Sequence, residues 1–202
     1  MTMTSFEQDR IDAAAKANLA EVEQVHKTAM ITTQAAAISA LENLRTRFPN
    51  SSFSIISHDR MLFHSINDQH EYGIVDSLGN EVVPYGRYKW IQNTFVDGFT
   101  RAMGKGGMSL LDIEGNVILV GFKEIWNFNK NYNDLVVKAD GVRYSISRDN
   151  LQKIRQLVKQ GRRPLTAKDI QDYFEYKEYL QHDEKFNAGV VFLSLVDYWK
   201  EK

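Results

Sequence analysis

Three histidines close together in the chain carry the side chains best suited to metal or proton chemistry. His58, His64 and His70 follow one another at intervals of six residues. Their neighbours include three carboxylates, Asp59, Asp68 and Glu71. Imidazole and carboxylate groups serve as zinc ligands and general bases, so a metal-dependent hydrolase is one interpretation. No HExxH spacing occurs, and predicted turns between the histidines would scatter their directions, so polar residues placed by turns are the favoured interpretation.

A second candidate is a basic run without acidic residues. Its members are Lys153, Arg155, Lys159, Arg162 and Arg163. Such a run could contact a phosphate backbone, which makes nucleic-acid binding another interpretation. However, an acidic stretch at 169–184 follows at once, and the net charge of −1 provides no general attraction to nucleic acid. We therefore expect mutual neutralisation between neighbouring helices.

Other signatures of catalysis are missing from the sequence. Lys105 lies in a glycine-rich run, but the Walker spacing with its Gly-Lys-Ser/Thr ending is absent. No Gly-x-Ser-x-Gly element is present. The chain has no cysteine, which excludes disulfides, thiolate metal sites and cysteine nucleophiles. We expect a non-enzymatic protein without cofactor or metal.

The stretch from Tyr72 to Ile146 contains an internal repeat. YGIVDSLGNEVVP at 72–84 is restated as MSLLDIEGNVILV at 108–120, an offset of 36 residues. Self-similarity at such a period indicates a repeat architecture. In both copies an Asp that can bond its own backbone precedes a Gly that supplies positive φ, so each copy is predicted to be a β-hairpin. Gly79, in the intact copy, is expected to matter more for stability than Gly115.

These residues resemble the bacterial WG repeats, whose units carry Trp-Gly or Tyr-Gly, then Asp, two residues, Gly, Lys or Asn, and a Val/Ile pair ending in Pro. The first copy matches at Tyr72, Gly73, Asp76, Gly79, Asn80, Val82, Val83 and Pro84. The second keeps Asp112, Gly115, Asn116, Val117 and Ile118, but has Met108-Ser109 for the aromatic-Gly pair and Leu119 for the Pro. A third, around Tyr144-Ser145-Ile146, keeps almost nothing. The resemblance implies β-rich modules suspected of protein binding, with no shared catalytic residues.

The surrounding patterns predict an α+β protein in three parts. Residues 1–49 should form a long N-terminal helix, because 5–48 contain no Pro or Gly and carry apolar residues at steps of three and four. Residues 50–148 should form an antiparallel β repeat domain, with a hairpin from 53–57 and 61–66 before the repeat. Residues 149–202 should be helices that cap the β domain. For 189–196 a helix is favoured over a strand.

The predicted helix is longer than the β domain requires. It could reach roughly 60 Å, whereas a domain of this size is roughly 30 Å across. We therefore expect self-association, as in a coiled coil, or docking on a protein partner; a helix folded along its own domain, or broken near 32–33, is the alternative. Exposed aromatic residues between the hairpins are further candidates for an interface. The predicted partner-binding residues are Ile31, Ile38, Leu41, Leu44, Tyr85, Tyr88, Trp90 and Trp126.

The leading hypothesis is an interaction or assembly module built on a WG-like β platform. The N-terminus, MTMTSFEQDR, lacks a cationic start followed by an apolar segment. No run approaches the ~18 apolar residues needed to cross a bilayer. We therefore expect a cytoplasmic protein without a membrane partner.

Overall fold

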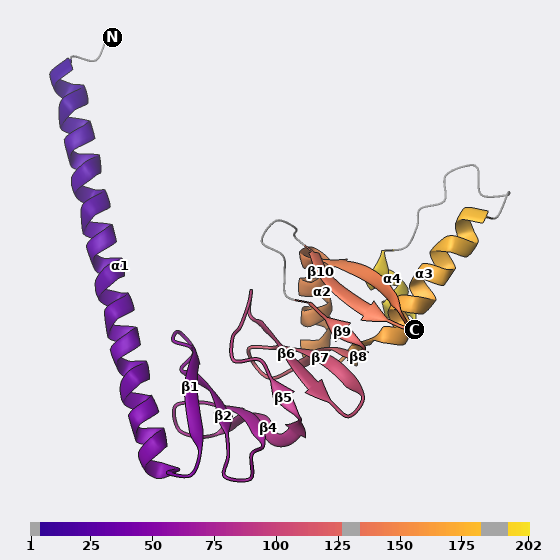
Figure 1. Cartoon of the computed structure of the whole chain (residues 1–202). Coiled ribbons are helices and arrows are strands. Elements are labelled where there is room, and N and C mark those ends of the chain that lie inside the picture. The colour runs from indigo at the N-terminus through magenta and orange to yellow at the C-terminus, as the bar shows by residue number, and fades with distance from the viewer. Residues whose placement is uncertain (1–4, 127–133, 183–193) are drawn as a thin grey trace.

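The structure is a computed structural model that describes residues 5–126, 134–182 and 194–202, with side chains described for 14–126, 134–178 and 194–202. The predicted α+β fold is confirmed: a long helix stands at the N-terminal end, antiparallel sheets follow, and helices occupy the C-terminal end (Figure 1). The helices are α1 (Ser5–Arg47), α2 (Arg148–Lys159), α3 (Ala167–His182) and α4 (Leu195–Glu201). None of the described helices combines the length and apolar character needed to cross a membrane.

The strands of the described residues form three sheets that succeed one another along the chain. The first contains β1 (Ser52–Ser57), β2 (Leu62–Ile66), β3 (Tyr72–Val75) and β4 (Glu81–Tyr88), in that order. The second has the order β12-β8-β7-β6-β5, from β5 (Trp90–Ile91), β6 (Phe99–Gly104), β7 (Gly107–Asp112), β8 (Val117–Phe122) and β12 (Leu165–Thr166). The third has the order β11-β10-β9, from β9 (Glu124–Ile125), β10 (Asp134–Ala139) and β11 (Val142–Ser147).

Each sheet begins with an edge strand that is followed by an antiparallel meander, and on this ground we treat each sheet as one repeat unit. Strands β1, β5 and β9 are edge strands, and an antiparallel meander continues from each of them. The third copy ends after β11, where α2 takes the place of a fourth strand. The sequence placed the start of the repeat at Tyr72, but the first unit begins at β1. Strands β1 and β2 correspond to β5 and β6 in position within the sheet and not in sequence.

The two predicted hairpin turns are confirmed and have the same hydrogen bonds. In each, Oδ1 of the aspartate, Asp76 or Asp112, accepts from the backbone N–H groups two and four residues later. Its Oδ2 accepts from the asparagine side chain four residues later, and all six bonds measure 2.8–3.1 Å. Gly79 and Gly115 have φ values of +83° and +82°. The turn therefore needs both an Asx acceptor and a residue that tolerates the left-handed region.

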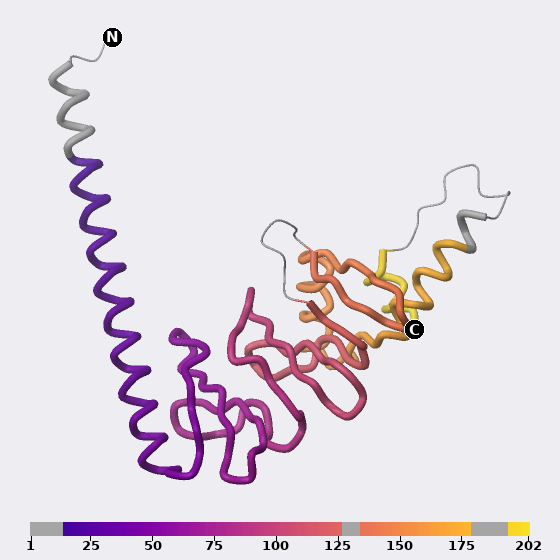
Figure 2. Tube along the Cα trace, in the orientation of Figure 1, coloured from indigo at the N-terminus to yellow at the C-terminus, as the bar shows by residue number. Residues whose placement is uncertain are grey.

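The described side chains form three apolar cores in series along the molecule. The first joins the end of α1 to the first sheet through Leu44, Phe53, Phe63 and Val75. The second lies between the first and second sheets and includes Ile74, Val83, Ile91 and Leu111. The third joins the second and third sheets to α2, α3 and α4 and includes Phe122, Leu135, Leu151 and Trp199. The trace accordingly passes from one end of the molecule to the other in sequence order (Figure 2), as in arrays whose units contact only their neighbours.

Helices close both ends of this array. A Cβ on Gly79 would lie 2.8 Å from the Phe48 ring, directly after α1. A Cβ on Gly115 would lie 2.3 Å from the carbonyl oxygen of Val82, on β4. The end of α1 therefore covers the first turn as β4 covers the second, and it acts as the N-terminal cap of the array.

The C-terminal region contributes a strand as well as helices. Leu165 and Thr166 of β12 pair in parallel with Leu119 and Val120 of β8 and cover an edge of the second sheet. The sequence patterns had predicted helices alone in this region. Residues 183–193 lie outside the described part of the chain, so most of the predicted helix at 189–196 does too, and α4 begins at Leu195.

Candidate functional site

Helix α1 packs on the sheets only near its C-terminal end. Ala37 and Leu44 are buried there, whereas every residue from 14 to 32 is exposed. We call residues 14–32 the α1 arm, and Figure 1 shows it rising away from the sheets. The hydroxyls of Thr28 and Thr32 bond to carbonyls four residues earlier at 2.9 Å, so the arm satisfies these groups within the helix. Because isolated helices gain little from propensity alone, burial against a partner would stabilise the arm.

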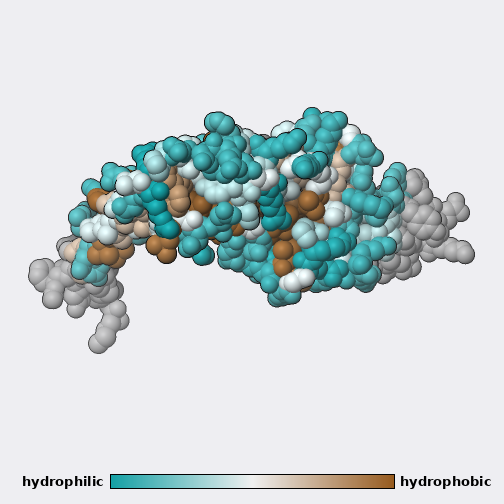
Figure 3. Space-filling view, turned by 90° about the horizontal axis from the view of Figure 1, so that it is seen from below, coloured by the Kyte–Doolittle hydropathy of each residue, from teal (hydrophilic) through white to brown (hydrophobic). Residues whose placement is uncertain are grey.

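The arm exposes several large apolar side chains. Leu19, Val22, Val25 and Met30 are 60%, 64%, 64% and 65% exposed. With 3.6 residues per turn, Leu19, Val22 and Met30 lie on the same side of the helix as Leu44. The face that packs on the first sheet therefore continues into the arm without a cover. Viewed from below, hydrophobic surface is visible at the α1 end and in a band over the sheets (Figure 3).

The four predicted partner residues of α1 do not share this face. Leu44 is buried and Leu41 half-buried against the first sheet, so they belong to the intramolecular contact. Ile31 and Ile38 are 59% and 45% exposed but point to another side, about 120–140° from Leu44. Three successive steps of three residues, from 35 to 44, each fall about 60° short of a full turn, so the predicted stripe drifts around the helix. The steps 15-19-22-26-30 do follow one face, and this signal was available in the sequence.

The four predicted aromatic residues lie in separate places. Tyr88 is buried and bonds to Ser109; burial, with that bond acting in the opposite direction, raises the pKa of Tyr88. Tyr85 is half-buried beside the first sheet. Trp90 is 37% exposed, and the Arg101 guanidinium lies 5.9 Å from its ring centre. Trp126 is half-buried, with Arg143 5.3 Å from its ring centre. They do not combine into one aromatic surface.

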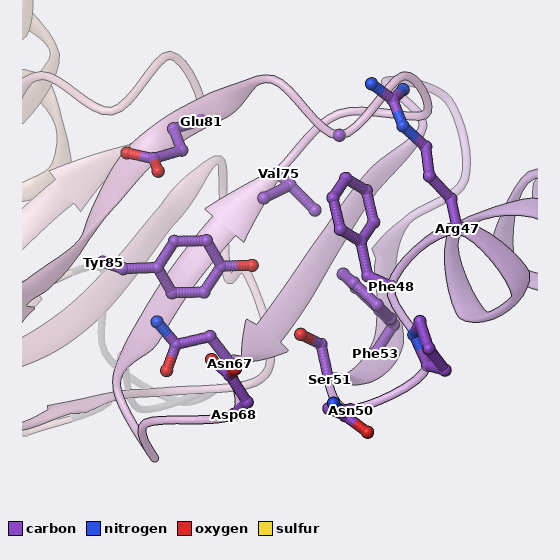
Figure 4. A pocket seen from close by; sticks show the side chains of 12 residues that line it. Arg47, Phe48, Asn50, Ser51, Phe53, Asn67, Asp68, Val75, Glu81 and Tyr85 are labelled. Carbon is purple, nitrogen blue, oxygen red and sulfur yellow. The ribbon is translucent and has the colours of Figure 1, made fainter.

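A pocket of about 360 Å³ lies at the base of α1 (Figure 4). Phe48, Phe53 and Val75 form its apolar wall, and Tyr85 closes another side. The Tyr85 hydroxyl donates to Ser65 Oγ at 2.6 Å. At the rim, Arg47 donates to the carbonyl of Leu78 at 2.8 Å and lies 5.1 Å from the Phe48 ring centre. The pocket is large enough for a small amphipathic group, but its tyrosine and arginine are already engaged within the protein.

Comparisons with known proteins provide no indication of function, so the function must be argued from the geometry of the structure. No protein-family model, curated protein or solved structure matches the chain. The resemblance to WG repeats therefore stays a prediction that rests on the motif residues. The exposed arm, the pocket and the charged clusters are the features from which a function can be argued.

The histidine region does not have the geometry of a metal site. His58 and His70 are exposed on separate turns. His64 is buried in β2, where its Nε2–H donates to the carbonyl oxygen of Ile91 at 3.0 Å and its ring lies 5.6 Å from that of Tyr72. Within the described residues no group of three His, Cys, Asp or Glu side chains could hold a metal ion. His64 instead links the first sheet to the second.

This placement predicts a pH dependence of stability. Burial, opposed in part by the bond to Ile91, lowers the pKa of His64. The unfolded chain therefore takes up a proton first, and the free energy of unfolding should fall as the pH drops below about 6.5. Thermal melts at pH 7.5 and 5.5 should show a smaller decrease for His64→Gln than for the wild type. His58→Gln, on an exposed turn, is the control, and equal decreases in all three proteins would contradict the prediction.

The basic run has partners within the chain. Arg155 pairs with Asp112 at 3.1 Å, Lys159 with Glu114 at 2.5 Å, and Arg163 with Asp169 at 2.7 Å, while Arg162 donates to the carbonyl of Trp199. Among the described side chains, which reach residue 178 of the acidic stretch, the Arg163–Asp169 pair alone matches the predicted contact. Arg155 and Lys159 reach the second hairpin turn instead, because α2 packs against β8. These intramolecular pairs take up most of the charge that nucleic-acid binding would use.

Proposed function

We propose that the protein is a non-enzymatic interaction or assembly module, in which a platform of degenerate WG-type units presents the α1 arm to a protein partner. The observation that carries the proposal is the exposure of Leu19, Val22 and Met30 on a helix face whose continuation is buried. Leaving such side chains in water forfeits about 1.5–3 kcal/mol each relative to burial. A cytoplasmic setting is part of the proposal.

Two features of the platform support this role. The three cores in series and the caps at both ends hold the body together without the arm, so the arm is available for binding. The first sheet also holds the C-terminal end of α1 through Leu44, so a partner bound to the arm is held in a fixed position relative to the sheets. The enzyme and nucleic-acid alternatives lose support from the separated histidines and the paired basic run.

The proposal predicts that two substitutions on the arm abolish partner binding without loss of folding. In Leu19→Asp/Val22→Asp the introduced carboxylates are exposed in the free protein and would be desolvated in a complex, so the melting temperature should change little while binding is lost. Ile31→Asp is a matched control, because Ile31 is 59% exposed but points to another side of the helix.

Tagged proteins can be compared by quantitative mass spectrometry after purification from the source cell, with a differently tagged second copy co-expressed. A partner enriched with the wild type and with Ile31→Asp, but recovered at least roughly tenfold less with the double variant, supports the proposal. Equal recovery with all three proteins overturns it, as does failure of the wild type to enrich either the second copy or any other protein.

A further inference from the structure

The same arm carries an arrangement of charges that fits a particular partner. Lys16, Glu23 and Lys27 flank the apolar face on one side, and Asn18 and Val25 flank it on the other. Within the side chains that the structure describes, no ion pair involves Lys16 or Glu23. Their separation of seven residues, about 10 Å along the axis, is too long for them to pair within one helix.

We infer that the partner of the arm is a second copy of this chain, and that the two arms pair antiparallel; this inference rests on the proposed function. When Leu19 of one copy packs beside Val22 of the other, a two-fold axis crosses the helices between these residues. Antiparallel pairing brings the same flank of both helices together. Lys16 of each copy then lies beside Glu23 of the other, which gives two ion pairs across the dimer.

Parallel pairing lacks this complementarity. It sets opposite flanks against each other, so Lys16 and Glu23 would face the uncharged Asn18 and Val25. The sheets also exclude it. Because Ala37 and Leu44 of the same face are buried against the first sheet, a parallel helix on that face would enter space that the sheet occupies.

The length of the arm agrees with an antiparallel pair. With the axis between Leu19 and Val22, residue 32 of one helix lies opposite residue 9 of the other. The overlap is then 24 residues, about 36 Å, and it stops before the part of α1 that packs on the sheet. Thr33, directly after the arm, is the first residue of α1 with a described side chain to be partly buried. The two β bodies would lie at opposite ends of the paired helices, away from each other.

Cysteine cross-linking in the full-length protein tests the orientation, since the natural chain has no thiol. In the antiparallel dimer Ala15 lies opposite His26 of the second copy. A mixture of Ala15→Cys and His26→Cys proteins should form a mixed disulfide under mild oxidation. Neither variant should cross-link to itself, because two copies of one cysteine would be 11 residues, about 16 Å, apart along the axis, beyond the ~7 Å limit for a disulfide.

Charge reversal tests the ion pairs by sedimentation equilibrium. Lys16→Glu and Glu23→Lys should each raise the dimer dissociation constant by roughly tenfold at low salt, and the double variant should restore it. The differences should shrink at high salt. Gln24→Glu, on the far side of the helix, is the control and should leave the constant unchanged.

Each other outcome has a distinct meaning. If the Ala15→Cys protein by itself forms disulfide-linked dimers, the arms pair in parallel and the antiparallel inference is overturned. A wild type that stays monomeric at all concentrations overturns the second copy as partner. If the wild type is monomeric but Leu19→Asp/Val22→Asp abolishes recovery of another protein, the dimer inference fails and the proposed function stands. If the double variant also leaves recovery of other proteins unchanged, the dimer inference and the proposed function both fail.

Discussion

Gly115→Ala is expected to lower the free energy of unfolding by about 3 kcal/mol or more, the largest effect of any single methyl group added to the repeat turns. Two costs combine at this position. Gly115 has a φ of +82°, where an L-residue is strained by about 1–2 kcal/mol. The added Cβ would also meet the carbonyl oxygen of Val82 at 2.3 Å, and a backbone atom cannot move aside as a side chain can.

Two other glycines separate these costs. Gly141 has a φ of +86° and no atom of the described residues within 4 Å of an added Cβ, so Gly141→Ala should cost about 1 kcal/mol from backbone strain alone. At Gly79 the Cβ would meet the Phe48 ring at 2.8 Å, and this ring can shift, so Gly79→Ala should be intermediate. Denaturant unfolding curves give the order, and a loss at Gly115 no larger than that at Gly141 would show that the two units do not approach each other as described.

This order reverses the expectation from sequence, in which Gly79 of the intact copy mattered more. The motif reports the local turn, and both turns were predicted correctly because Asp76, Gly79, Asp112 and Gly115 act through bonds within a few residues. What lies above each glycine depends on the packing of one unit on the next. No local pattern records that contact.

The limits of the repeat were harder to predict for the same reason. Strands β1 and β2 occupy the positions of β5 and β6 in their sheet but share no motif with them, and β12 is two residues long and pairs in parallel. The pairing of these strands depends on which sheet edge is open and on the apolar core they cover, and not on the types of their residues. In the candidate site, the sequence predicted the length of α1, but the exposed face depends on where the helix leaves the sheet. Ala37 is buried and the adjacent Ile38 is not.

The second large loss of stability is expected from a substitution of Asp112, which begins the turn that contains Gly115. Asp112 has no exposed surface, and its carboxylate accepts from the Arg155 Nε at 3.1 Å in addition to the three bonds of the turn. The Arg155 side chain is itself only 18% exposed. Asp112→Ala leaves the donors of the turn and a buried guanidinium without an acceptor, so the free energy of unfolding should fall by about 3–5 kcal/mol.

Asp76 provides the matched comparison, because it makes the same three turn bonds in a half-exposed site where water can replace them. Asp76→Ala should cost about 1 kcal/mol. The larger loss at Asp112 is attributed to the Arg155 guanidinium, which stays buried without its carboxylate. Arg155→Met combined with Asp112→Ala should therefore recover part of the lost stability. The coupling free energy in this double-mutant cycle measures the contact between α2 and the second sheet. Should Asp112→Ala fail to fold, Asp112→Asn completes the same cycle. Equal losses at Asp76 and Asp112, or purely additive effects with Arg155→Met, would mean that α2 caps the array through its apolar face alone, with Leu151 and Ile154 as the contact and the ion pair without consequence.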